Sequence, residues 1–161
     1  MVEQRRKVRP PRGLNRLFYR FPILLYKVGL GRLFGKRFLM LTHIGRISGR
    51  PRYAVLEVIR WDETSEAYYV LSGFGRESDW VLNLRAKPEV EITVGGHQLA
   101  ATAEFLSESD TEFELLDYAR RNPIAARHLP RLLGYQVDGS EEGYRALARH
   151  LLVVRFRSRE G

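Results

Sequence analysis

The feature that most constrains the fold is an alternation of apolar and polar residues on both sides of a Gly-Gly pair, Gly95-Gly96. The apolar positions are every second residue: Val90, Ile92 and Val94 before the pair, and Leu99, Ala101, Ala103 and Phe105 after it. Two glycines supply the positive φ angles that a two-residue turn between antiparallel strands requires. We therefore predict a β-hairpin over 90–105, with one face of each strand in a core.

Similar patterns predict the remaining elements. Strand-like apolar runs lie at 38–42, 53–61, 67–72 and 151–157, which gives about six strands with the hairpin, and helical periodicity occupies 79–87, 109–122, 123–133 and 140–148. The repeated alternation of strand and crossover helix that builds a parallel sheet is absent. We expect one α+β, β-rich domain over 1–161, a closed antiparallel β-barrel with peripheral helices.

The N-terminal region is basic and has two parts. Residues 1–13 contain five Lys and Arg residues together with Pro10 and Pro11, and we expect a mobile tail there. Over 14–35 apolar residues recur every three or four positions, which predicts an amphipathic helical segment that Pro22 bends or divides. Its apolar face would pack over the barrel or a second subunit, or alternatively lie in a lipid interface as a peripheral membrane contact.

The net charge of +8 is concentrated in the first third of the chain. Residues 1–60 contain 15 Lys and Arg against two acidic residues, whereas residues 61–161 contain 12 against 17. An anionic partner should therefore bind through the first third. A phosphate-bearing cofactor and a membrane surface are candidates, and without a recognition module we expect no nucleic acid.

The composition argues against several kinds of catalytic centre. Cysteine is absent, which removes thiolate nucleophiles, iron–sulfur clusters and most structural zinc sites, and fits a cytoplasmic location. The four histidines, His43, His97, His128 and His150, lack metal-ligand spacing, so we expect no metal. No G-x-S-x-G motif is present, and no apolar run reaches the roughly 20 residues of a membrane-spanning helix. A cofactor is therefore expected to carry the chemistry.

A turn-rich segment, 45–52, is the best candidate for anion binding. Its two glycines allow a tight turn, Ser48 offers a hydroxyl, and three arginines offer forked donors that suit phosphate or carboxylate. A solvated turn between two strands could have the same composition. A second glycine-containing loop, 73–78, lies between a strand and a helix, but it lacks the third glycine and the βαβ unit of a dinucleotide-binding turn.

Three segments, in the same order along the chain, resemble the deazaflavin-dependent nitroreductase and quinone reductase family. Residues 39–52, LMLTHIGRISGRPR, resemble the signature LLTTTGRKSGxPR, and residues 78–88, SDWVLNLRAKP, resemble xxWxxNLRANP. Residues 89–103 are similar to the strand, Gly-Gly and strand that follow in the family. The likeness covers residues 38–106 with the same order and spacing.

The resemblance implies a split β-barrel of the pyridoxine-phosphate-oxidase-like superfamily, commonly a homodimer. It further implies hydride transfer from reduced coenzyme F420 to a small acceptor: a quinone, a nitroaromatic or a conjugated enone. The residues that it assigns to the cofactor tail are Arg46, Ser48, Gly49, Arg50, Pro51 and Arg52. Those that it assigns to the border of the deazaflavin ring are Ser72, Gly73, Phe74, Trp80, Asn83 and Leu84.

The cofactor and the function each have an alternative, and the reaction also needs a proton donor. Ile47 replaces the lysine of the family signature, which removes one cationic contact to phosphate, so FMN is the alternative cofactor. A non-catalytic carrier of a cofactor or lipid is the alternative function. A tyrosine is expected to donate the balancing proton; of Tyr118, Tyr135 and Tyr144 in the C-terminal half, we select Tyr135.

Overall fold

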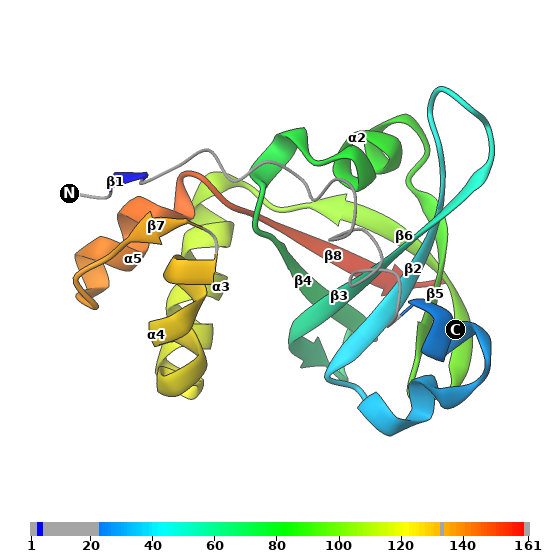
Figure 1. Ribbon diagram of the computed structural model, residues 1–161, viewed down its shortest axis with the longest axis horizontal. Helices are drawn as coiled ribbons and strands as arrows, with labels where there is room; N and C mark the ends of the chain where they lie inside the picture. The colour runs from blue at the N-terminus through cyan, green and yellow to red at the C-terminus, as the bar shows by residue number, and fades with distance from the viewer. Residues whose placement is uncertain (1–2, 5–22, 133, 160–161) are drawn as a thin grey trace.

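A computed structural model of the chain describes residues 3–4, 23–132 and 134–159. The predictions for the tail 1–13 and for residues 14–22 lie outside these residues. Six strands form a closed antiparallel barrel in the order β2-β3-β4-β8-β6-β5, and the helices α3, α4 and α5 stand together beside it (Figure 1). This architecture confirms the predicted α+β barrel of about six strands.

The barrel strands are β2 (Phe38–Ile44), β3 (Pro51–Asp62), β4 (Ala67–Ser72), β5 (Glu89–Val94), β6 (His97–Phe105) and β8 (Leu152–Ser158). The helices are α2 (Asp79–Ala86), α3 (Glu108–Arg121), α4 (Pro123–Leu132) and α5 (Glu141–Ala148), with two 3-10 helices, η1 (Leu30–Phe34) and η2 (Gly75–Glu77). Outside the barrel, β1 (Glu3–Gln4) pairs with β7 (Tyr135–Gln136). The sequence did not predict this pair, because a two-residue strand carries no periodicity.

The predicted Gly-Gly hairpin closes the barrel. Val94 pairs with His97 around Gly95 and Gly96, whose φ angles are 57° and 83°. β5 then pairs with β2, where Met40 is opposite Thr93. Because neighbouring residues of a strand point to opposite faces, this register directs Leu41 and Ile92 into the barrel and Met40 and Thr93 to its outer surface.

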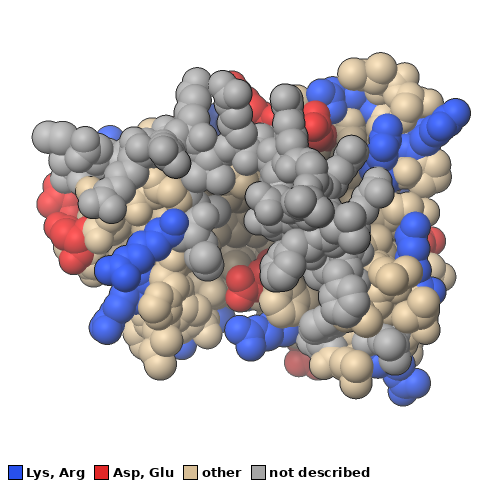
Figure 2. All heavy atoms as spheres, viewed as in Figure 1, with Lys and Arg blue, Asp and Glu red and all other residues tan. Residues whose placement is uncertain are grey.

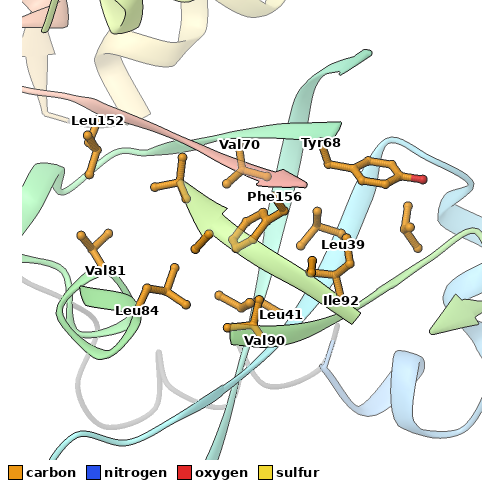
Figure 3. Close-up of a cluster of buried hydrophobic side chains, with 14 residues drawn as sticks. Leu39, Leu41, Tyr68, Val70, Val81, Leu84, Val90, Ile92, Leu152 and Phe156 are labelled. Atoms are coloured by element: carbon orange, nitrogen blue, oxygen red, sulfur yellow. The ribbon is translucent and has the colours of Figure 1, made fainter. Parts of the chain in front are cut away.

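The core lies inside the barrel and is closed at one end by α2. Leu39, Leu41, Ile92 and Phe156 have no exposed surface, and Leu84 of α2 packs among them (Figure 3). Each fully buried side chain of this size contributes roughly 1.5–3 kcal/mol of transfer free energy. Packing of α2 in this core fixes the position of the loops on either side of it.

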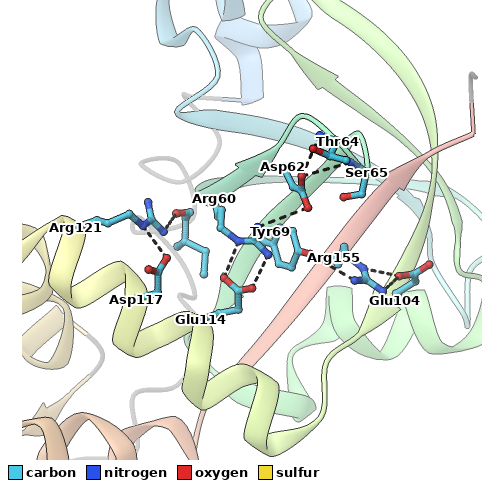
Figure 4. A network of polar contacts seen from close by, with 11 residues as sticks. Arg60, Asp62, Thr64, Ser65, Tyr69, Glu104, Glu114, Asp117, Arg121 and Arg155 are labelled. Atoms are coloured by element: carbon cyan, nitrogen blue, oxygen red, sulfur yellow. Dashed lines mark hydrogen bonds and ion pairs between the residues drawn. The ribbon is translucent and has the colours of Figure 1, made fainter.

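Polar contacts join the barrel to the helical layer (Figure 4). Arg60 of β3 donates from Nε and Nη2 to the buried carboxylate of Glu114 on α3, at 2.9 and 2.7 Å. The register between β3 and β4 shifts at Ile59, and Arg121 Nη2 donates to the Ile59 carbonyl oxygen at 2.9 Å. The helical layer is thus held against one side of β3.

The described part of the N-terminal segment is a short helix over 23–27 followed by η1. Tyr26 is buried, whereas Leu24, Val28 and Leu33 are 55%, 60% and 78% exposed. The backbone N–H of Gly95 donates to the carbonyl of Gly35 at 3.1 Å and ties the segment to the hairpin turn. Among the described residues, no helix has the length and apolar character needed to span a bilayer.

Candidate functional site

The loop between β2 and β3 is an ordered turn. Gly49 N–H donates to the Gly45 carbonyl at 2.8 Å, and Gly45 N–H donates to the Arg50 carbonyl at 2.9 Å. Gly49 has a φ of 67°, which favours glycine at this position. Ser48 Oγ accepts from Arg50 N–H at 3.3 Å, so the Ser48 hydroxyl stabilises the turn itself.

Asn83 of α2 connects this loop to the end of the barrel. Its Oδ1 accepts from the Arg46 backbone N–H at 3.0 Å and from Arg46 Nη1 at 2.9 Å. Arg46 Nη2 also lies 3.2 Å from Asp79 Oδ1. Arg46 therefore holds the loop against α2, and this cluster of Arg46, Asp79 and Asn83 fixes where the loop begins.

His43 lies beneath the loop and completes the contacts of Asn83. The side chain is buried, and its Nδ1 lies 3.2 Å from Asn83 Nδ2. Because Asn83 Oδ1 accepts from Arg46, Asn83 Nδ2 is the donor and Nδ1 the acceptor. Burial, followed by the charge of Arg52 directly opposite on β3, lowers the pKa of His43 to about 4, although Asp79 acts in the opposite direction. His43 is therefore neutral at pH 7.

Arg50 and Arg52 differ from Arg46 in their partners. Both are exposed, and neither guanidinium forms an ion pair with a carboxylate of the described residues. Between them and Arg46, Ile47 is 90% exposed at the tip of the loop. Lys and Arg side chains are visible at the upper right of the face in Figure 2, where Figure 1 places this loop. Two forked cations are thus available to an anionic ligand.

The predicted ring-border residues fall into two groups. Gly73 is half-buried, Phe74 is exposed and Trp80 is half-buried against the barrel core. Ser72, Asn83 and Leu84 are buried. Ser72 Oγ donates to the Gly75 carbonyl at 2.7 Å, and Leu84 packs inside the barrel. These two side chains therefore stabilise the loops by contacts in the interior of the protein.

The three tyrosines considered as proton donors occupy different places. Tyr135 is buried among the helices, where its ring stacks on His150 with centroids 5.5 Å apart, and Tyr144 Oη donates to the Ala126 carbonyl at 3.0 Å. The structure therefore does not place Tyr135 beside the loops. Tyr118 lines a cavity of about 80 Å³ together with Gly73, and its Oη donates to Glu57 Oε1 at 3.4 Å.

No site role was predicted from the sequence for His43 or Glu57. His43 lies within the family-like segment 39–52, but its burial and its contact with Asn83 cannot be read from residue types. Glu57 lies 61 positions from Tyr118, so no local motif joins the two residues. Burial, followed by the nearby Glu57 carboxylate, raises the pKa of Tyr118, which keeps its phenol protonated at pH 7.

The barrel and its end loops define the class of fold as a split β-barrel. A pyridoxamine 5'-phosphate oxidase-related, FMN-binding protein from Nostoc punctiforme is similar over 91% of this chain and 81% of its own, with 11% identity and a TM-score of 0.53. A structure described as an F420-H2 dependent reductase (FDR-A) is similar over 76% of this chain and 96% of its own, with 20% identity and a TM-score of 0.52. A third, described as a domain-swapped dimer, covers 90% of this chain and 100% of its own, with 17% identity and a TM-score of 0.53. These similarities establish the fold.

The sequence identifies the family within that fold. Residues 25–128 match the profile of the F420H(2)-dependent quinone reductase family, and the chain belongs to this family. It is therefore a deazaflavin-dependent oxidoreductase that uses coenzyme F420 and acts on a small molecule, which confirms the predicted family, enzyme class and cofactor. No curated protein sequence matches the chain.

Replacing His43 with Gln tests the buried neutral imidazole beneath the loop. A folded-state pKa of about 4, below the ordinary 6.5, means that between these values the unfolded chain binds the extra proton, so stability falls as the pH falls. From pH 7 to pH 5 this contribution is about 2 kcal/mol. Urea unfolding at pH 7 and at pH 5 gives the free energy of unfolding at each pH. Between the two values this free energy should fall by about 2 kcal/mol less in His43→Gln than in the wild type. A His97→Gln control at an exposed site should keep the wild-type decrease, and equal pH dependence in all three proteins would contradict the assignment.

Proposed function

We propose that Arg50 and Arg52 bind the phosphate and carboxylate groups of the F420 tail. This proposal rests on a difference in contacts among the three arginines of the loop. Arg46 is bonded to Asn83 and Asp79, whereas Arg50 and Arg52 are exposed without a described carboxylate partner. Guanidinium groups bind phosphate and carboxylate through two parallel N–H donors, which suits the acidic tail. Ser48, Gly49 and Pro51 then set the shape of the loop that presents them.

The deazaflavin ring, in this proposal, borders Gly73, Phe74 and Trp80. When bound, F420 supplies the hydride, and the chain contributes position and exclusion of water. We propose a quinone as the acceptor, because the family to which the chain belongs is described by that activity. Nitroaromatics and conjugated enones also have electron-poor π systems that accept hydride, and they are the other acceptors to test.

Titration with oxidised F420, followed by its fluorescence, tests the tail site. Arg50→Ala and Arg52→Ala should each weaken binding about tenfold or more, since a hydrogen bond to a charged group is worth about 1.5–3 kcal/mol. Arg159→Ala, which removes an exposed arginine at the end of β8, should bind like the wild type. Unchanged affinity in both loop variants would overturn the proposed tail site, and tighter binding of FMN than of F420 would favour the flavin alternative.

Ile47→Lys offers a gain of function at the same loop. The side chain at position 47 is 90% exposed at the loop tip, so lysine can be introduced without repacking. An added ammonium beside a phosphate should tighten F420 binding by about three- to tenfold, equivalent to about 0.6–1.4 kcal/mol. The gain should shrink at high salt, because exposed charges are screened. An affinity equal to that of the wild type at low salt would argue against a phosphate at this position.

We also propose that the chain forms a homodimer. The structurally similar domain-swapped dimer and the exposed apolar side chains of Leu24, Val28 and Leu33 support this proposal. Light scattering should give a mass near twice 18.7 kDa, and Leu24→Ser with Leu33→Ser should lower it. A monomer would contradict the dimer, and a monomer that binds anionic phosphatidylglycerol vesicles through these side chains would assign them to a lipid surface instead.

A further inference from the structure

A groove of about 600 Å³ lies on the outer surface of the barrel, away from the β2–β3 loop and its Asn83 contacts. Its floor is made of outward-facing residues of four adjacent strands: Met40, Thr42, Tyr53, Glu91, Thr93 and Gln98. Its remaining wall comes from the segment 26–32, which Figure 1 shows beside β2 and β5. The volume lies within the range of small-molecule sites, whereas the 80 Å³ cavity beside Tyr118 is below it.

The wall over the groove is held in place at several points. Gly31 packs against the ring of Tyr26, and the Arg32 side chain lies across Gly96 of the hairpin turn, so both glycines permit a close approach that a Cβ would block. Lys27 Nζ lies 4.0 Å from the centroid of the Tyr53 ring. These contacts, together with the Gly95 to Gly35 hydrogen bond, make the groove a built feature of the fold.

Two polar groups of the groove, the Thr93 hydroxyl and the Lys27 ammonium, are hydrogen-bond donors for which no acceptor is found among the described residues. Among the described residues, Thr93 Oγ1 is buried and has no hydrogen-bond partner. Lys27 contacts a ring and forms no ion pair with a described carboxylate. The carboxylate of Glu91 accepts from Gln98 Nε2 at 3.2 Å. A ligand that carries oxygen acceptors on a planar ring would satisfy Thr93 and Lys27 and could stack on Tyr53.

The groove is also connected to the proposed cofactor site along β3. Tyr53, Val55 and Glu57 occupy alternate positions and share the outer face, as their pairing with Thr42, Met40 and Phe38 shows. Tyr53 borders the groove and Glu57 borders the small cavity with Gly73. The two ends of this row are about 13 Å apart. Val55 lies between these two residues, so the groove and the small cavity beside Gly73 are joined along one face of β3.

We propose that this groove binds the electron acceptor as a quinone, with Thr93 and Lys27 donating to its carbonyl oxygens. This inference rests on the proposed function. Reduced F420, when bound, would supply a hydride, which carries two electrons and one proton, and would itself be oxidised. The Lys27 ammonium would stabilise the negative charge left on one quinone oxygen and donate the second proton, which completes the hydroquinone. Water would then reprotonate Lys27.

Menadione, a small naphthoquinone, provides the test in two measurements. Ligand-observed NMR on the cofactor-free protein should show binding that Thr93→Val weakens about five- to tenfold, the equivalent of one hydrogen bond. The thermal stability of this variant should be unchanged or higher, because the hydroxyl has no partner to lose. Lys27→Met should lower kcat for menadione at least tenfold. Both variants should bind F420 like the wild type.

Lys36→Met is the matched control, since Lys36 Nζ also lies over an aromatic ring, 4.9 Å from the Trp61 centroid, but outside the groove. It should leave menadione binding and kcat unchanged. Normal F420 binding with unaltered menadione binding and turnover in both Thr93→Val and Lys27→Met would overturn the groove assignment alone. Failure of the wild type to bind F420 would overturn the proposed function, and with it this assignment.

Discussion

The side-chain amide of Asn83 is the contact on which the geometry of the site depends. It receives two hydrogen bonds from Arg46 and gives one to His43, so a single residue of α2 joins the loop, the helix and strand β2. Such a buried amide is stable only when its partners are complete, because an unpaired polar group in this position costs about 1–3 kcal/mol. The neutral state of His43 is therefore part of the same arrangement, since a protonated Nδ1 could not accept.

In this arrangement the arginines of one short loop differ in their contacts: one holds the loop against α2, and two are exposed. The family-like segment contains three arginines, and sequence alone gives them equal status. In the structure Arg46 is bound to α2, whereas Arg50 and Arg52 are exposed and form no ion pair with a described carboxylate, which is why we propose them as the contacts to the cofactor tail. Fixing the loop by a protein contact reduces the conformational entropy that a ligand would otherwise have to remove. Ile47 at the tip is where this chain departs from the family signature, and it is also where a charge could be added most easily.

The barrel could be predicted from sequence because its strands alternate clearly and its tightest hairpin contains Gly-Gly. The family-like motifs assign Trp80 and Arg52 to the cofactor site, and these assignments stay predictions. The burial of Ser72 and Leu84 could not, because a motif records residue types and does not show which way a side chain points. Tyr135 was selected for its place in the chain, yet tertiary packing puts it against His150. The groove was also unpredictable, since its floor combines β2, β3, β5 and β6 with a segment that reads as a simple amphipathic helix.

The most direct test of the central assignment is the oxidation of reduced F420 by menadione, catalysed by the wild-type protein and followed by the return of F420 absorbance. We predict that oxidation is fast only when protein and menadione are both present, and that reduced FMN does not replace reduced F420. No acceleration over the protein-free mixture with any quinone, nitroaromatic or enone, or turnover with FMN alone, would contradict the assignment of this chain as an F420-dependent reductase.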